Sequence, residues 1–188
     1  MLQLRGRLHL DLLIDNETMG VRDAQAPLSL SKRSGESYQH VLLKLLGFVL
    51  FYHPELQVEV SAGQHHKPDL VRFDARGEPV QWVECGLIKR RKLDRISARN
   101  KLTFIDVIKA TETEMRSYAR STRGHLRAPE RVRYFGFRRG FVDELAEAVY
   151  DHATVRARVT GPRWDALVAL IDDIELHTPV VCELGQGE

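Results

Sequence analysis

Two acidic residues with chemically useful spacing, Asp69 and Glu84, each stand at one end of a strand-like stretch. The stretches 68–74 and 80–86 are rich in Val, Phe and Trp, and residues 75–78 between them suit a hairpin loop. Pairing the two strands across this loop places Leu70 opposite Val83 and Asp69 opposite Glu84. We therefore expect the two carboxylates to lie about 4.5–5.5 Å apart at Cβ, at the end of an apolar face.

Two negative charges so close together repel each other, and burial increases the cost. Unless one carboxyl group is protonated, a positive group must complete the site, and a divalent metal ion is the natural candidate. The plainer alternative is that Asp69 and Glu84 are ordinary carboxylates at strand ends. A shift of one residue in the register would remove their pairing.

A strongly basic stretch follows the second acid. Between Lys89 and Lys101 seven Lys or Arg residues stand against one acid, Asp94, although the chain as a whole has a net charge of only +2. This asymmetry indicates an anionic partner, and we expect nucleic-acid contacts from Lys89, Arg90, Arg91, Lys92, Arg95 and Arg99. A phosphate-binding track would be extended by Arg116, Arg120, Arg123, Arg127, Arg131 and Arg133. A solvated helix face that needs no partner is the alternative.

The surrounding pattern predicts one mixed α/β domain over residues 1–188, with a central mixed sheet flanked by helices. Residues 15–34 are expected to be turn-rich, with a short extended piece at 27–30, and Ser34 is the predicted N-cap of a helix with Glu36 in its first turn. The tail at 164–181 fits either a helix or a strand. Strands are predicted at 2–14, 56–61, 68–74, 80–86, 101–110, 132–137 and 154–159, and helices at 34–53, 89–100, 111–121 and 142–152.

Composition excludes several classes of protein. The chain is 43% apolar and 29% charged, as in ordinary globular proteins, and Cys85 and Cys182 are too few for a disulfide framework or a zinc site. We expect a reduced, cytoplasmic setting. The apolar run 41–52 contains Lys44 and is too short to span a bilayer, so no membrane partner is expected. Neither a phosphate-binding loop nor a nucleophile motif is present.

The order of these features resembles the PD-(D/E)xK nuclease-like superfamily and, within it, the YaeQ family of small bacterial proteins. The resemblance spans roughly residues 5 to 160 and implies a restriction-endonuclease-like core. The matching residues are Leu28-Ser29-Leu30 ahead of Glu36, then Pro68-Asp69-Leu70, Trp82-Val83-Glu84-Cys85-Gly86, Arg91-Lys92-Leu93 and Val132-Arg133-Tyr134.

The resemblance implies a metal-dependent phosphodiesterase that acts on nucleic acid. Asp69 and Glu84 would be the paired ligands of Mg²⁺ or Mn²⁺, joined by Glu36 and by the backbone carbonyl of Cys85. For Glu36 the favourable position of an acid at a helix N-terminus is an equal explanation.

One position departs from the superfamily pattern. The superfamily has a lysine two residues after the second acid. This chain has Gly86 at that position, and YaeQ-like proteins also have a glycine there. Lys89 or Lys92 would supply the missing ammonium group, and the sequence does not choose between them. A catalytically inactive protein of the same fold, which binds nucleic acid or a protein partner, is the alternative function.

Overall fold

The computed structural model describes residues 6–186, which form ten β-strands, four α-helices and a short 3-10 helix, η1 (Pro129–Arg131). The chain divides into two compact units. The first contains the described residues up to Tyr52 together with Phe137–Val180, and the second contains His53–Gly136 and the described residues from Val181 onward. Each unit combines helices with parallel and antiparallel strands, which confirms the predicted mixed α/β class.

The first unit is built on a sheet with the strand order β2-β1-β8-β9-β10. Strands β1 and β8 are parallel, and the other neighbours are antiparallel. Along β1 every second side chain, from Leu8 to Ile14, is buried, so one face of the sheet lies against the core. The strands are β1 (Arg7–Asn16), β2 (Val21–Ser31), β8 (His152–Thr160), β9 (Ala166–Ile171) and β10 (Ile174–Leu184).

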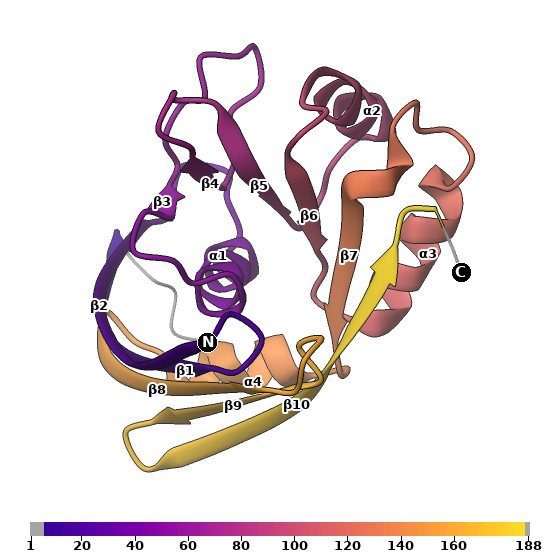
Figure 1. The fold of residues 1–188 in the computed structure, drawn as a ribbon. Coiled ribbons are helices and arrows are strands. Elements are labelled where there is room, and N and C mark those ends of the chain that lie inside the picture. Colours follow the sequence, from indigo (N-terminus) through magenta and orange to yellow (C-terminus); the bar gives the residue numbers. More distant parts are fainter. Residues whose placement is uncertain (1–5, 187–188) are drawn as a thin grey trace. The chain divides into compact units, whose positions relative to one another are not determined.

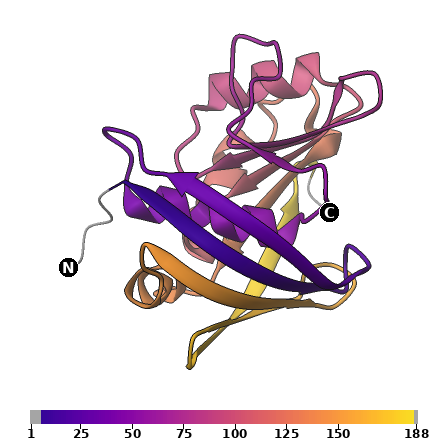
Figure 2. The ribbon, with the colours of Figure 1, turned by 90° about the vertical axis from the view of Figure 1, so that its left-hand side faces the viewer.

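Helix α1 (Tyr38–Leu50) fills the core of this unit, and every residue from Val41 to Leu50 is buried. It contacts β1, β2, β8 and the short helix α4 (Phe141–Ala148), and Figures 1 and 2 show it on the inner side of the curved sheet. The predicted N-cap was wrong by three residues, because the Ser37 side chain accepts a hydrogen bond from the His40 N–H at 3.1 Å. Glu36 therefore precedes the helix and does not lie in its first turn.

The prediction of a turn-rich segment at 15–34 was also wrong. Strand β2 has 11 residues and pairs along its length with β1, with Leu28 opposite Leu10 and Leu30 opposite Leu8. The local pattern hides this strand because Pro27 and Asp23, which has φ +48°, interrupt it. Both residues are tolerated because β2 is an edge strand of the sheet. The backbone N–H and C=O groups on its outer side need no partner strand.

The second unit has the strand order β7-β6-β5-β4-β3, in which β5, β6 and β7 are parallel. Helix α2 (Arg90–Arg99) connects β5 to β6 and helix α3 (Glu112–Thr122) connects β6 to β7, as two successive strand–helix–strand units. The predicted strand at 56–61 is reduced to two residues. The strands are β3 (Gln57–Val58), β4 (Leu70–Phe73), β5 (Pro79–Cys85), β6 (Phe104–Ile108) and β7 (Val132–Phe137).

One face of this second sheet packs against helices α2 and α3. Trp82 of β5 and Val107 of β6 are buried there against Leu93 and Ile96 of α2 and Met115 of α3. Figure 1 shows α2 and α3 on the same side of β6 and β7. Because β5 and β6 are parallel, their carboxyl ends meet at one edge, and this edge carries the candidate site.

The tail of the chain, which the sequence left open, forms the hairpin of β9 and β10. Beyond Val180 it belongs to the second unit, where the Gly185 N–H donates to the Val132 carbonyl at 2.8 Å. Within residues 6–186 no helix is long and apolar enough to cross a membrane.

Candidate active site

The two acids lie where the hairpin register predicts. Leu70 pairs with Val83 and Val71 with Trp82, so the next rung towards the edge brings together Asp69, just before β4, and Glu84, the penultimate residue of β5. Asp69 Oδ2 accepts a hydrogen bond from the Cys85 N–H at 2.7 Å. The predicted register is thus confirmed at this end, and it shifts by one residue only at Phe73, near the loop.

Glu84 is 3% exposed, and both of its carboxylate oxygens are engaged. The Trp82 Nε1–H donates to Oε1 at 2.8 Å, and Lys92 Nζ donates to Oε2 at 2.7 Å. Burial raises the pKa of Glu84, Lys92 opposes this rise most strongly, and the nearby charge of Asp69 adds to it. The positive group that the acid pair requires is therefore present as Lys92.

The open choice between two lysines has a structural answer. Gly86 leaves β5 with φ +66°, and the buried Ile88 anchors the short connection to α2. Lys89 is the N-cap residue and is exposed, whereas Lys92 lies one turn into the helix, on the side that faces Glu84. Across residues 6–186 Lys89 forms no ion pair, so Lys92 is the lysine that the fold brings to the acids.

Glu36, predicted as a third carboxylate of the site, belongs to the first unit, while Asp69 and Glu84 belong to the second. Its Oε1 lies 2.5 Å from Lys44 Nζ and 3.3 Å from His40 Nε2, and its Oε2 accepts from the Arg33 N–H at 2.8 Å. Lys44 is completely buried in α1. These contacts give Glu36 a structural role as the counter-charge of Lys44, and its role as a metal ligand stays a prediction.

Sequence reasoning missed two residues at the same edge of the sheet. Lys109 directly follows β6, its Nζ donates to the Gly86 carbonyl, and it lies 4.0 Å from the centre of the Tyr118 ring of α3. Burial lowers the pKa of Lys109 to about 8. Burial also raises the pKa of Tyr118, and the charge of Glu84 contributes to this rise. The available signal was position, because Lys109 is the first charged residue after an apolar parallel strand.

The donor set at this edge suits a hard divalent cation. Two carboxylates, with the Cys85 carbonyl as a further candidate ligand, are the oxygen donors that Mg²⁺ and Mn²⁺ prefer. Over residues 6–186 no group of three or more His, Cys, Asp or Glu side chains is arranged to hold a metal ion. A cation here would either share Glu84 with Lys92 or take the place of Lys92.

Uncompensated positive charge is concentrated on α2. We call the exposed residues Lys89, Arg90, Arg91, Arg95 and Arg99 the basic face of α2; in the described chain none of them is in an ion pair. Elsewhere, Arg127 pairs with Asp94, and Arg116 and Arg123 pair with Glu183. Arg133 lies mostly buried, with Nε 2.6 Å from Asp106 Oδ1, so it does not extend an exposed track.

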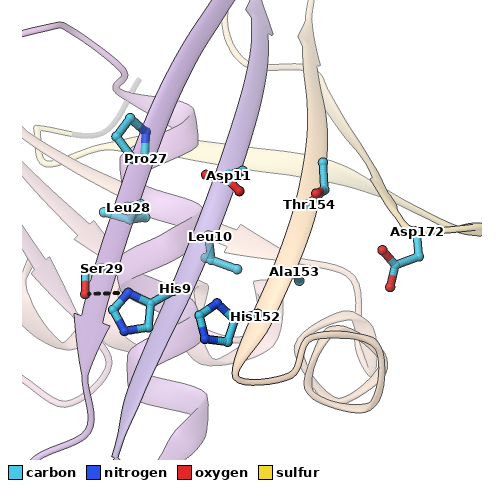
Figure 3. Close-up of a pocket in the computed structure, with 10 residues that line it drawn as sticks. All are labelled: His9, Leu10, Asp11, Pro27, Leu28, Ser29, His152, Ala153, Thr154 and Asp172. Carbon is cyan, nitrogen blue, oxygen red and sulfur yellow. Dashed lines mark hydrogen bonds between the residues drawn. The ribbon is translucent and has the colours of Figure 1, made fainter.

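A polar depression lies on the outer face of β1, β2 and β8 in the first unit (Figure 3), with a volume of about 430 Å³. The rings of His9 and His152, which pair in register on neighbouring strands, stack with centroids 5.0 Å apart. Ser29 Oγ lies 3.4 Å from His9 Nδ1, and Asp11 follows on the same strand. Exposed imidazoles bind transition metals, so this pair must be controlled for in any metal titration of the protein.

Comparison with known proteins decides the family. The family model described as YaeQ protein matches residues 17–164. The chain belongs to the YaeQ family. Two solved YaeQ structures share its fold. The protein from Xanthomonas axonopodis pv. citri is 18% identical with a TM-score of 0.77, and the alignment covers 95% of this chain and 97% of that chain. The protein from Pseudomonas syringae is 13% identical with a TM-score of 0.75, and 93% of each chain is covered. No curated protein matches the chain.

Proposed function

We propose that this YaeQ-family chain is a cytoplasmic, metal-dependent phosphodiesterase of the PD-(D/E)xK type, with a restriction-endonuclease-like core, that acts on nucleic acid. The observation that carries the proposal is the 2.7 Å contact of Lys92 Nζ with Glu84 Oε2, beside Asp69. Lys92 of α2 thus lies beside the acid pair, although position 86, two residues after Glu84, is a glycine and has no side-chain amine. Acid pair and lysine are the three reactive groups of a nuclease of this type.

Each group has a definite role in this proposal. Asp69 and Glu84 would hold Mg²⁺ or Mn²⁺, and the ion would polarise the phosphodiester and lower the pKa of an attacking water. Lys92 stabilises the negative charge that develops on the phosphoryl oxygens. Trp82, which is fully buried, fixes the orientation of Glu84 through its hydrogen bond to Oε1.

The basic face of α2 supports a nucleic acid as the substrate. Its five residues adjoin Lys92 on the same helix and form no ion pairs in the described chain. Binding of this kind weakens steeply with salt, because each phosphate that is neutralised releases condensed counterions. We therefore expect non-specific, salt-sensitive binding of the backbone.

The test is incubation of labelled single- and double-stranded DNA and RNA with the protein in Mg²⁺ or Mn²⁺. Asp69→Asn, Glu84→Gln and Lys92→Met are each expected to reduce cleavage about 10²-fold or more, the usual effect of removing one stabilising group. Lys101→Met is the control, since Lys101 is exposed, lies outside the basic face of α2 and does not contact Glu84. Wild-type protein without cleavage, or cleavage that survives Asp69→Asn combined with Glu84→Gln, contradicts the proposal.

One observation favours a second candidate, the binding of nucleic acid without turnover. Both Glu84 oxygens already have donors, and Lys92 already compensates the charge. This candidate predicts that the combined change Arg91→Glu and Arg95→Glu abolishes the affinity for nucleic acid. Asp69→Asn should leave that affinity unchanged. If an acidic protein is the partner of the basic face, nucleic acid will not bind, and an excess of DNA will not displace that protein.

A further inference from the structure

The two partners of Glu84 differ in mobility. Trp82 is completely buried and is two residues away on the same strand, so its indole N–H is fixed relative to Oε1. Lys92 reaches Oε2 through a flexible four-carbon side chain that is 29% exposed. Glu84 therefore has one permanent donor and one donor that can leave without any rearrangement of the core.

The charges at this edge also favour an exchange. Asp69 and Glu84 carry two negative charges when ionised, and Lys92 carries one positive charge 2.7 Å from the buried carboxylate. A divalent cation that bound Glu84 while Lys92 stayed in place would repel the Lys92 ammonium group beside a buried carboxylate, where repulsion is strong. A cation that replaces Lys92 compensates Glu84 without this repulsion.

We propose that Lys92 and a divalent cation bind Glu84 alternately, and that Lys92 moves from Glu84 to the phosphate of the substrate when the cation is bound. Without a cation Lys92 keeps the buried carboxylate compensated and the site assembled. After the exchange its ammonium group remains tethered to α2, beside the basic face, where phosphoryl oxygens are its natural partners. This inference rests on the metal requirement of the proposed function.

The exchange has a thermodynamic consequence that a static ion pair lacks. Lys92 competes with the cation, so the intact protein binds the cation more weakly than a variant without the ammonium group. A phosphate that accepts Lys92 removes the competitor, and the cation and the nucleic acid then strengthen each other's binding to the same extent.

The closing experiment measures Mn²⁺ affinity by calorimetry at pH 8. All proteins carry His9→Asn and His152→Asn, which removes the stacked imidazoles as a competing metal site. Lys92→Met is expected to bind Mn²⁺ at least about tenfold more tightly, a difference of ~1.4 kcal/mol. Arg95→Met is the matched control, because it removes an exposed positive charge one turn along α2, and its affinity should stay within about twofold of the parent.

A second readout covers the loss of stability that Lys92→Met causes. Mn²⁺ should raise the Tm of Lys92→Met and of Lys92→Gln more than it raises that of the parent. Equal or weaker binding by Lys92→Met overturns the exchange, and the proposed function survives if the parent binds Mn²⁺ in a manner that Asp69→Asn abolishes. Absence of Mn²⁺ binding to both parent and Lys92→Met overturns the exchange and the metal requirement together.

Discussion

At the scale of single residues, burial gives Lys109 an influence on stability that depends on pH. Its pKa falls from 10.5 to about 8, with desolvation as the main cause and the charges of Glu114 and Cys85 in opposition. Between these two values the unfolded chain binds more protons than the folded protein, so stability rises with pH across this interval.

We expect wild-type protein to gain on the order of 2–3 kcal/mol relative to Lys109→Met between pH 8 and 10.5. Urea denaturation at steps from pH 7 to 10.5 provides the measurement. Below pH 8 the two proteins should show parallel dependence. The exposed residue Lys101 is the control, since Lys101→Met should parallel wild type throughout. The same parallel behaviour for Lys109→Met would contradict the expectation.

Two neighbouring tyrosines differ in whether their hydroxyl groups have partners. The Tyr134 hydroxyl lies 2.7 Å from Thr122 Oγ1, whereas the Tyr118 hydroxyl is buried and has no hydrogen-bond partner among the described residues. Tyr134→Phe should cost about 1 kcal/mol of unfolding free energy, and Tyr118→Phe should be neutral or slightly stabilising. Chemical denaturation of both variants gives the comparison, and an equal cost for both would show that the Tyr118 hydroxyl is satisfied.

The acid pair shows how far a site can be predicted from local pattern. Alternation and loop length were enough to set Asp69 opposite Glu84, because both are properties of one short hairpin. The choice of Lys92 over Lys89 depends on where α2 begins after Gly86, and the sequence does not fix that to one residue. Lys109 and Tyr118 were missed because their contacts join two separate strand–helix connections.

At the scale of elements, α2 has a poorly stabilised N-terminus. Its N-cap Lys89 makes no side-chain hydrogen bond, and its first turn holds Arg90 and Arg91 but no acid. Positive charges there oppose the helix dipole. In contrast, Thr111 caps α3, whose first turn contains Glu112 and Glu114.

Lys89→Asp should therefore raise the unfolding free energy by about 1 kcal/mol, through a new cap and a favourable charge. The same change should weaken nucleic-acid binding and reduce its dependence on salt by about one counterion. Thermal unfolding and titration with a single-stranded oligonucleotide at several salt concentrations measure the two effects. A more stable protein with unchanged affinity would remove Lys89 from the interface.

Elements with strong local signals were predicted well, and those defined by distant partners were not. The helices α1, α2 and α3 lie close to their predicted bounds, because helix-forming residues and apolar periodicity mark them locally. Strand β2 and the β9–β10 hairpin become strands through pairing, and neither stands out in its own sequence.

At the scale of the whole molecule, the mixed α/β class was predictable and the division into two units was not. Strands β1 and β8 come from opposite ends of the chain and pair in parallel, and no local pattern indicates such a contact. The single domain over residues 1–188 stays a prediction, as does the restriction-endonuclease-like core.

The role of Glu36 can be tested by replacing it alone and together with Lys44. Glu36→Ala leaves the buried Lys44 without this carboxylate and should cost about 3–5 kcal/mol, which Lys44→Met in the same chain should largely restore. If Glu36 is only structural, the double variant keeps the Mn²⁺ affinity of the parent, measured in the background without His9 and His152. Loss of that affinity in a stably folded double variant would place Glu36 in the ligand set.

Gly86 limits how the site can be redesigned. Its φ of +66° is a conformation that a lysine adopts only with strain of about 1–2 kcal/mol. The Gly86 carbonyl also accepts a hydrogen bond from the ammonium group of Lys109. Placing a lysine at this position with Gly86→Lys should therefore not rescue Lys92→Met. In this fold an amine beside Glu84 has to come from a neighbouring element, because the residue two places after Glu84 holds a turn conformation that favours glycine.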